Sequence, residues 1–167
     1  MVLNKKAEVP KKLYNSLTSE ALSRSQWHYF KQEENIKRIL DANLNRCREG
    51  LRVVEDSLRF VLNDGVLYKK IRSVRHNVDK VFRNRYIELI KERNSFDDTG
   101  RQLPEISKKG LPDVVVANFK RTQESLRVLE EYAKTFEPAA SACFKKERYA
   151  TYIIEKSVYL KYKNFFK

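Results

Sequence analysis

The chain contains an internal repeat. ANLNRCREGLRVVED at residues 42–56 returns as ANFKRTQESLRVLEE at residues 117–131, with eight of the fifteen aligned positions identical. In both copies the apolar residues recur at steps of three and four, which is the period of a helix that buries one face. Two copies of such a helix each need a partner for that face. The repeat therefore predicts a helical domain that uses one structural unit twice.

The rest of the chain also favours helices. Only four of the 167 residues are Gly and four are Pro, which leaves little turn material for a sheet protein. Apolar periodicity predicts helices at about 19–32, 34–63, 66–93, 113–136 and 139–162. The predicted fold is all-α, a bundle of about five helices built on a duplicated helical hairpin. We expect residues 1–35 to form an arm with a short helix, and 36–167 to form the helical domain.

The charge of the chain points to anionic ligands. The formal net charge is +13, and it is spread along the sequence. A nucleic-acid binder usually concentrates its charge in one patch, so the spread argues against that class. A positive field attracts small-molecule phosphates such as nucleotides. A lysine-rich solvated surface is the plainer alternative.

Targeting and redox signals favour a cytoplasmic protein. No apolar run reaches the roughly 18 residues that a membrane span needs, and the start, MVLNKKAEVPKKLYN, lacks the apolar stretch of a secretion signal. Cys47 and Cys143 stand alone within helical patterns and suit a reducing compartment as small buried hydrophobes. Oligomeric state is open, and a homo-oligomer is compatible with the sequence.

The polar residues of the repeat lie at the border of the apolar stripe. On a helical wheel Asn43, Arg46 and Gly50 share one edge. A glycine inside a helix costs about 1 kcal/mol relative to alanine, so close approach of the second repeat helix near Gly50 and Ser125 is expected. Two interpretations of the matched polar groups remain open, a buried ion network and a ligand site.

Taken singly, charged positions of the repeat have the spacing of solvated pairs. Glu55 with Arg59, and Arg52 with Asp56, are i,i+4 partners of the kind found on exposed helix faces. Taken as a set, however, the matched charges favour a buried ion network or a ligand site over a solvated face, because such a face has no need to keep the same residues in both copies.

Five motifs resemble those of a known family. DANLNRCREGLRVVEDSLRFVLND, which begins at Asp41, resembles the opening motif of the all-helical hydroxymethylpyrimidine phosphate kinase family of thiamine biosynthesis. The resemblance covers roughly 40–156 and continues through VRHNVDKV (74–81), RNSFDDTGR (93–101), VVVANFKRTQESLRVLEEYAK (114–134) and FKKERYATYIIEK (144–156). In this family the domain occurs alone or fused to the N-terminus of thiamine phosphate synthase, which is therefore a candidate partner. Where similar sequences read Arg-Asp, this chain has Arg93-Asn94.

The resemblance implies phosphoryl transfer from ATP, with Mg²⁺, to the phosphate of hydroxymethylpyrimidine phosphate. Such a reaction needs cations around several phosphate groups, and arginine pairs with phosphate oxygens through two donors. The predicted catalytic residues are the charged pairs of the repeat, Arg46, Glu49, Arg121 and Glu124. The predicted phosphate-binding residues are Asn43, Arg52, Arg75, His76, Arg101, Asn118, Arg127 and Arg148. The predicted magnesium ligands are Asp97 and Asp98.

Two hypotheses make different structural predictions. A kinase predicts a mixed Asp/Arg cleft where the 94–112 loop folds over the repeat helices. A non-catalytic helical partner or regulatory domain of the synthase predicts that the polar repeat residues pair with one another and leave no pocket.

Overall fold

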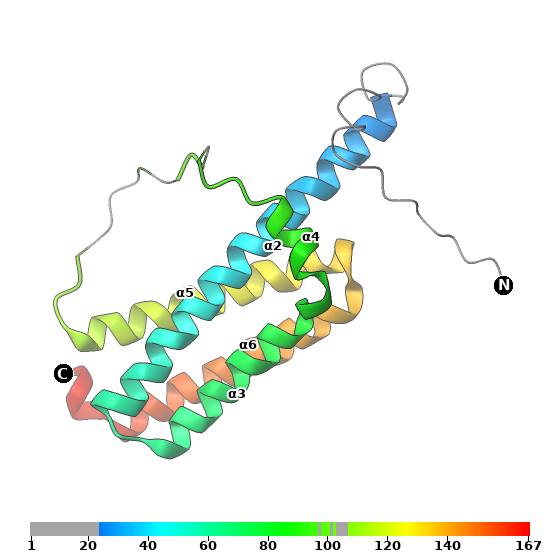
Figure 1. Ribbon diagram of the computed structural model, residues 1–167. Coiled ribbons are helices and arrows are strands. Elements are labelled where there is room, and N and C mark those ends of the chain that lie inside the picture. Colours follow the sequence, from blue (N-terminus) through cyan, green and yellow to red (C-terminus); the bar gives the residue numbers. More distant parts are fainter. Residues whose placement is uncertain (1–23, 97, 101, 103–106) are drawn as a thin grey trace. The chain divides into compact units, whose positions relative to one another are not determined.

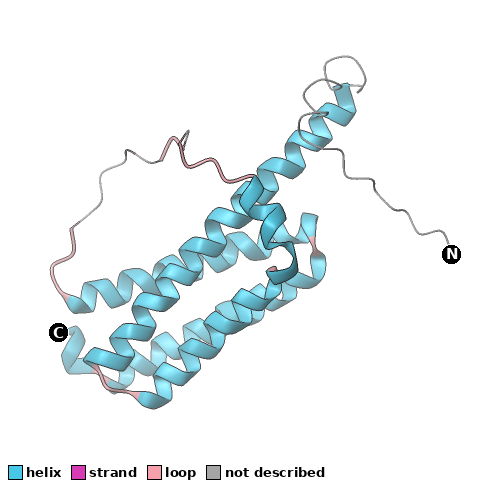
Figure 2. Ribbon diagram, viewed as in Figure 1, coloured by secondary structure: helices cyan, strands magenta, loops and turns pink. Residues whose placement is uncertain are grey.

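The computed structural model describes residues 24–96, 98–100, 102 and 107–167. The chain divides into two compact units, Met1–Glu34 and Asn35–Lys167. Most of the predicted arm, residues 1–23, lies outside the described residues. The described residues form helices and loops without a β-strand (Figure 2). The all-α prediction is confirmed, and five α-helices are present in this part of the chain.

The helices follow the predicted pattern, with two differences. Their bounds are α2 Arg24–Asp56, α3 Gly65–Val81, α4 Tyr86–Lys91, α5 Leu111–Phe136 and α6 Pro138–Lys161. Shorter turns are the π-helical Ser57–Val61 and the 3₁₀ segments Arg83–Arg85 and Lys163–Phe166. The boundary predicted between 32 and 34 is wrong, since no Gly or Pro precedes Gly50 in α2 to end a helix there.

The second difference is a break at Phe82. The helix predicted over 66–93 is instead α3, a 3₁₀ turn and α4, because Phe82 leaves helical geometry at φ −113° and ψ 23°. Its ring is buried and packs 5.9 Å from the Phe136 ring and 5.6 Å from the Phe144 ring, measured between centroids. Aromatic contacts of this kind outweigh the continuation of one helical turn.

Helices α3, α5 and α6, with the part of α2 that lies in the unit Asn35–Lys167, supply most of the bundle core (Figure 1). α5 and α6 form one hairpin, and α3 packs along α6. Apolar side chains from all four helices are fully buried in one core, among them Leu40, Cys47, Leu51, Val54, Ile71, Val78, Phe119, Leu126, Leu129, Phe144 and Val158. Burial raises the pKa of the Cys47 thiol, which confirms its interpretation as a small core residue. None of the helices in the described residues is long and apolar enough to cross a membrane.

The two repeat helices cross at Gly50, as predicted. A Cβ at Gly50 would lie 2.6 Å from Thr122 Oγ1 and 3.0 Å from the Asn118 carbonyl oxygen, so only glycine allows α2 this close to α5. The atoms of α5 nearest to Gly50 belong to Asn118 and Thr122. Ser125, which the sequence placed near the crossing, is buried one turn beyond Thr122 on the same helix.

The turns of the two hairpins differ in chemistry. Between α2 and α3, Asn63 adopts φ 50° and the Asp64 carboxylate accepts hydrogen bonds from the backbone N–H groups of Val66 and Leu67, both at 3.0 Å. This is side-chain capping of a helix N-terminus. Between α5 and α6 the capping residue Glu137 makes no such bond, and Pro138 begins α6, where its missing N–H has no partner to lose.

Candidate functional site

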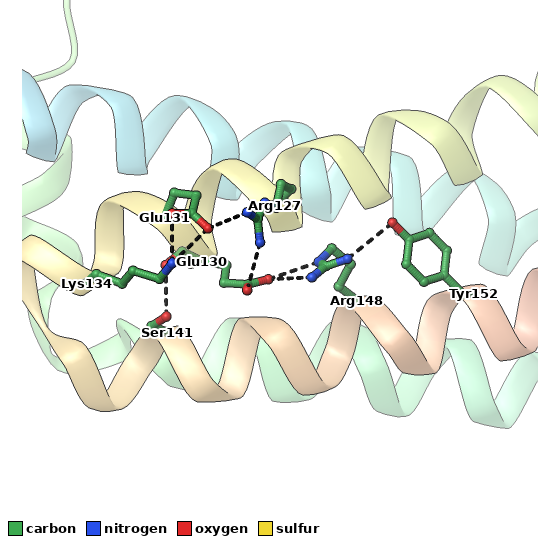
Figure 3. Close-up of polar contacts among 7 residues, drawn as sticks. All are labelled: Arg127, Glu130, Glu131, Lys134, Ser141, Arg148 and Tyr152. Carbon is green, nitrogen blue, oxygen red and sulfur yellow. Dashed lines mark hydrogen bonds and ion pairs between the residues drawn. The ribbon is translucent and has the colours of Figure 1, made fainter.

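A buried ion-pair network links α5 to α6 in the second hairpin. Glu130 of α5 accepts hydrogen bonds from Arg148 of α6 at 3.0 Å (Nε) and 2.8 Å (Nη2). Arg127, one turn earlier on α5, donates to the other oxygen of Glu130 at 3.0 Å. Figure 3 shows Glu130 held between these two guanidinium groups, with Tyr152 beyond Arg148. The Tyr152 hydroxyl and Glu130 together raise the pKa of Arg148.

The first hairpin contains the same network. Glu55 of α2 is 1% exposed and accepts from Arg75 Nε of α3 at 2.7 Å and from Arg52 at 3.4 Å. The hydrogen bond that Arg75 donates to Glu55 is the main cause of the raised pKa of Arg75. Glu55 thus belongs to a buried ion network, one of the two interpretations that the sequence left open, and its main partner comes from the next helix and not from Arg59. Four of the predicted phosphate-binding arginines are already paired with protein carboxylates, namely Arg52, Arg75, Arg127 and Arg148.

The side chains of the two matched asparagines form hydrogen bonds within their own helices. Asn43 donates its side-chain amide to the Ile39 carbonyl at 2.9 Å, and Asn118 does the same to Val114 at 2.8 Å. These bonds satisfy polar groups beside the helix crossing. Much of the identity between the two copies is thus accounted for by packing and polar pairing.

Four matched charged residues remain without such a role. Arg46, Glu49, Arg121 and Glu124 are all exposed, and the described residues offer them no hydrogen bond or ion pair. Each pair lies within a turn of the contact between Gly50 and the α5 residues opposite it. The crossing therefore brings the predicted catalytic set to one neighbourhood and leaves it open to solvent. Their catalytic role stays a prediction.

The remaining predicted residues give a mixed picture. His76 is exposed on α3, while Asp97 and Arg101 lie outside the described residues. Asp98 is exposed and accepts a hydrogen bond from the Gly100 N–H at 2.8 Å, as in an ordinary Asp turn. Among the described residues no group of three or more His, Cys, Asp or Glu side chains could hold a metal ion. Magnesium requires only one or two protein carboxylates when phosphates supply the other oxygens, so Asp98 remains compatible with that role.

A cleft of about 360 Å³ lies between α2, α3 and the start of α4, and the sequence analysis did not anticipate its residues. Leu44, Val78 and Phe82 supply its apolar surface. Its polar lining consists of Asp41, Asn45, Arg48, Asp79, Arg83 and Tyr86. The kinase hypothesis predicted a mixed Asp/Arg cleft where the 94–112 loop folds over the repeat helices. This cleft has the predicted composition but not the predicted place, since its lining contains no residue of the described part of that loop and none of α5.

Ion pairs hold the two acidic side chains of the cleft. Asp41 forms a bidentate ion pair with Arg93, and both N–O distances are 2.7 Å. This contact raises the pKa of Arg93. Asp79 lies 3.5 Å from Arg75 and 2.7 Å from Arg48 Nε. The Arg48 contact has poor hydrogen-bond direction, so the buried Oδ1 of Asp79 accepts no hydrogen bond from the described residues. The charged partner of this buried oxygen is therefore Arg48, and a ligand N–H that binds here would take the place of that ion pair.

The cleft lining contains residues of two of the motifs on which the family resemblance depends. Asp41 opens the first motif and Asp79 belongs to VRHNVDKV. Arg93, which opens RNSFDDTGR, does not line the cleft but pairs with Asp41. Arg38 also donates to the Asn94 carbonyl at 3.1 Å, which fixes the start of the long loop beside α2. The sequence held a partial signal for the cleft, because the two polar lining residues that lie within the repeat, Asn45 and Arg48, are at positions where the two copies diverge.

The second hairpin shows this divergence directly. Asn45 and Arg48 of the first copy correspond to Lys120 and Gln123 of the second. Gln123 donates to Glu155 at 2.6 Å, and Lys120 lies 3.4 Å from the other oxygen of Glu155. At these positions the second copy forms a closed polar cluster on α5 and α6.

Fold and site together define a small all-α bundle of two related hairpins, with a mixed-charge cleft in the first. Residues 38–157 match the ThiD2 family, and the chain belongs to that family. Its relatives include the thiamine-phosphate synthases of Rhodopirellula baltica (39% identical over 135 residues, 78% of this chain and 36% of that protein) and Gloeobacter violaceus (40% over 125 residues, 74% and 36%). The synthase of Synechocystis is 42% identical over 123 residues, 72% of this chain and 35% of that protein.

These comparisons support a family of thiamine biosynthesis. The chain spans about a third of the length of the curated relatives it matches. No solved structure matches the chain.

Proposed function

We propose that the chain transfers the γ-phosphoryl group of ATP to the phosphate of hydroxymethylpyrimidine phosphate. The products are ADP and the pyrimidine diphosphate, which is the kind of substrate that a thiamine-phosphate synthase consumes. Membership of the ThiD2 family and the synthase relatives support the pathway. The observation that carries the proposal is the mixed-charge cleft, because its lining contains residues of two of the motifs that resemble the kinase family, and Arg93 of a third motif pairs with Asp41 in that lining.

The reaction places heavy demands on positive charge. An oxygen of the acceptor phosphate attacks the γ-phosphorus, and the bond to the β–γ bridging oxygen breaks as ADP leaves. Cations must offset the negative charge of both phosphate groups throughout. Three arginines have no ion pair among the described residues and lie at the crossing or the cleft: Arg46, Arg121 and Arg83.

Magnesium enters this proposal with the nucleotide. Mg²⁺ bound with the nucleotide would neutralise phosphate charge, and one or two protein carboxylates would be enough to hold it. Asp98, with its neighbour Asp97, is the predicted protein contribution. Glu49 and Glu124, exposed beside the unpaired arginines, are alternative carboxylates at the crossing.

The non-catalytic alternative receives less support. It predicted that the polar repeat residues pair fully and leave no pocket. The described residues instead include a cleft and, in its lining, an arginine without a carboxylate partner (Arg83). Features of this kind suit a ligand site better than a closed scaffold.

The test is a direct assay of turnover. Purified protein with Mg-ATP and hydroxymethylpyrimidine phosphate is expected to produce equal amounts of ADP and the pyrimidine diphosphate. Arg46→Ala and Arg121→Ala are each expected to lower kcat/KM about ten- to a hundredfold, the effect of one charge-assisted hydrogen bond in the transition state. Lys69→Ala, which removes an exposed charge near the start of α3, serves as the control. Absence of both products, with no thermal stabilisation by either substrate, would contradict the proposal.

A further inference from the structure

We infer that the cleft between α2 and α3 is the binding site for the phosphate acceptor, a monocyclic aminopyrimidine that carries one phosphate. The identity of this ligand rests on the proposed function. The location of its site rests on the size, surface and charges of the cleft.

The size of the cleft favours a small ligand. Its volume of about 360 Å³ is near the lower end of the roughly 300–1,000 Å³ range of small-molecule sites. That space suits a single ring with a phosphate better than a complete nucleoside triphosphate. The donor nucleotide is therefore assigned to another surface, and the unpaired arginines at the α2–α5 crossing are the candidates.

The apolar surface suits the ring. Val78 and Phe82 are buried side chains that face the cleft, and Leu44 packs against the same core. Tyr86 adds a half-exposed aromatic ring at the edge. A flat heteroaromatic ring can cover these groups, and the displaced water contributes binding free energy.

Asp79 suits the amino-substituted edge of that ring. Its Oδ1 is buried, faces the cleft lining and accepts no hydrogen bond from the described residues. Among the described residues this oxygen has an ion pair with Arg48 Nε at 2.7 Å. We infer that the ligand amino group replaces Arg48 as the partner of Asp79, and Arg48 is then available to the phosphate.

Arg83 suits the phosphate itself. It is exposed, lines the cleft and has no ion pair within the described part of the chain. Arg48 provides a second guanidinium on the same wall. Arginine binds phosphate oxygens through two N–H groups at once, so one or two such residues fix the phosphate at the mouth of the cleft.

Calorimetric titration of the full chain tests this assignment. The two ligands are hydroxymethylpyrimidine phosphate and unphosphorylated hydroxymethylpyrimidine. Arg83→Gln is expected to weaken binding of the phosphorylated ligand about tenfold or more and to leave the unphosphorylated one unchanged. Asp79→Asn is expected to weaken both ligands. Lys69→Gln, the matched loss of an exposed charge at the other end of α3, is expected to bind like the wild type.

The outcomes separate this inference from the proposed function. If Arg83→Gln and Asp79→Asn both bind as the wild type does, the cleft is not the acceptor site, even when the protein turns over. If these variants lose binding while the wild type produces no ADP, the cleft assignment stands and the kinase proposal falls. Arg83 has no ion-pair partner among the described residues to lose on substitution, so its variant tests the assignment even if Asp79→Asn folds poorly.

Discussion

The two hairpins are held together by the same kind of ion-pair network, but they differ in the polar residues beside it. In each, a glutamate on the first helix is held by an arginine on the second and by another arginine one turn earlier on its own helix. The first hairpin then has a cleft beside this network, at Asn45, Arg48 and Asp79, whereas the second fills the corresponding positions with a cluster around Glu155.

Residues that are identical in both copies would be expected to form the functional site. Most of them instead stabilise the bundle through packing and ion pairs. Among the positions that differ between the copies, Leu44, Asn45 and Arg48 line the cleft. Packing and ion pairing do not explain why Arg46 and Glu49 are identical to their counterparts Arg121 and Glu124.

The largest effect is expected from the shared network. Glu55→Gln and Glu130→Gln each leave a mostly buried arginine without its carboxylate, which is expected to lower the free energy of unfolding by about 3 kcal/mol. Glu49→Gln and Glu124→Gln, at exposed positions of the same helices, are expected to change it by less than about 0.5 kcal/mol. Chemical denaturation of the four variants measures this. A large loss in only one hairpin would show that the two networks are not equivalent.

A smaller effect is expected at the turn of the first hairpin. Burial alone would raise the pKa of Asp64, but hydrogen bonds from Lys161, the Leu67 N–H and Tyr162 lower it from 3.8 to about 2. Asp64→Ala is therefore expected to cost on the order of 2 kcal/mol near neutral pH. Since the folded-state pKa is depressed, the stabilisation is complete above about pH 4 and is lost as the pH falls toward 2.

Urea unfolding at several pH values checks this expectation. The gap in stability between wild type and Asp64→Ala should narrow between pH 4 and pH 2. Glu137→Ala, at the corresponding turn of the second hairpin, is the control and should change stability little, because Glu137 caps no backbone N–H with its side chain. An equal cost for both substitutions would mean that the two turns are alike after all.

The smallest of the three stability effects is expected at the crossing between the hairpins. Gly50→Ala places a methyl group against Thr122 Oγ1 and the Asn118 carbonyl. Overpacking costs about 1–3 kcal/mol and the better helix propensity of alanine returns about 1 kcal/mol, so a net loss of about 1 kcal/mol is expected. The double variant with Thr122→Ala should lose less than the sum of the single losses. Simple additivity in this double-mutant cycle would place the crossing elsewhere.

The sequence predicted the fold better than the site. Helical periodicity is a local property, and it located α5 and α6 to within about two residues. Gly50 also predicted the crossing, because a glycine inside a helix lowers its stability and close approach of a second helix explains why it is there. The burial of Glu55 could not be found in this way, since the arginine that holds it lies 20 residues away on the next helix.

The cleft was missed for a related reason. Its walls depend on how α2 faces α3 and on the break at Phe82, which follows from contacts with Phe136 and Phe144. No spacing rule within one helix predicts those contacts. Comparison of the two copies position by position does point to Asn45 and Arg48, once divergence rather than identity is taken as the signal.

The most direct test of this account follows backbone amide resonances of isotope-labelled protein during titration with hydroxymethylpyrimidine phosphate. The account predicts that the largest shifts cluster at residues of the first hairpin around the cleft, such as Leu44, Asn45 and Arg83. Shifts centred instead on Lys120, Gln123 and Glu155 of the second hairpin, or spread without a centre, would contradict it.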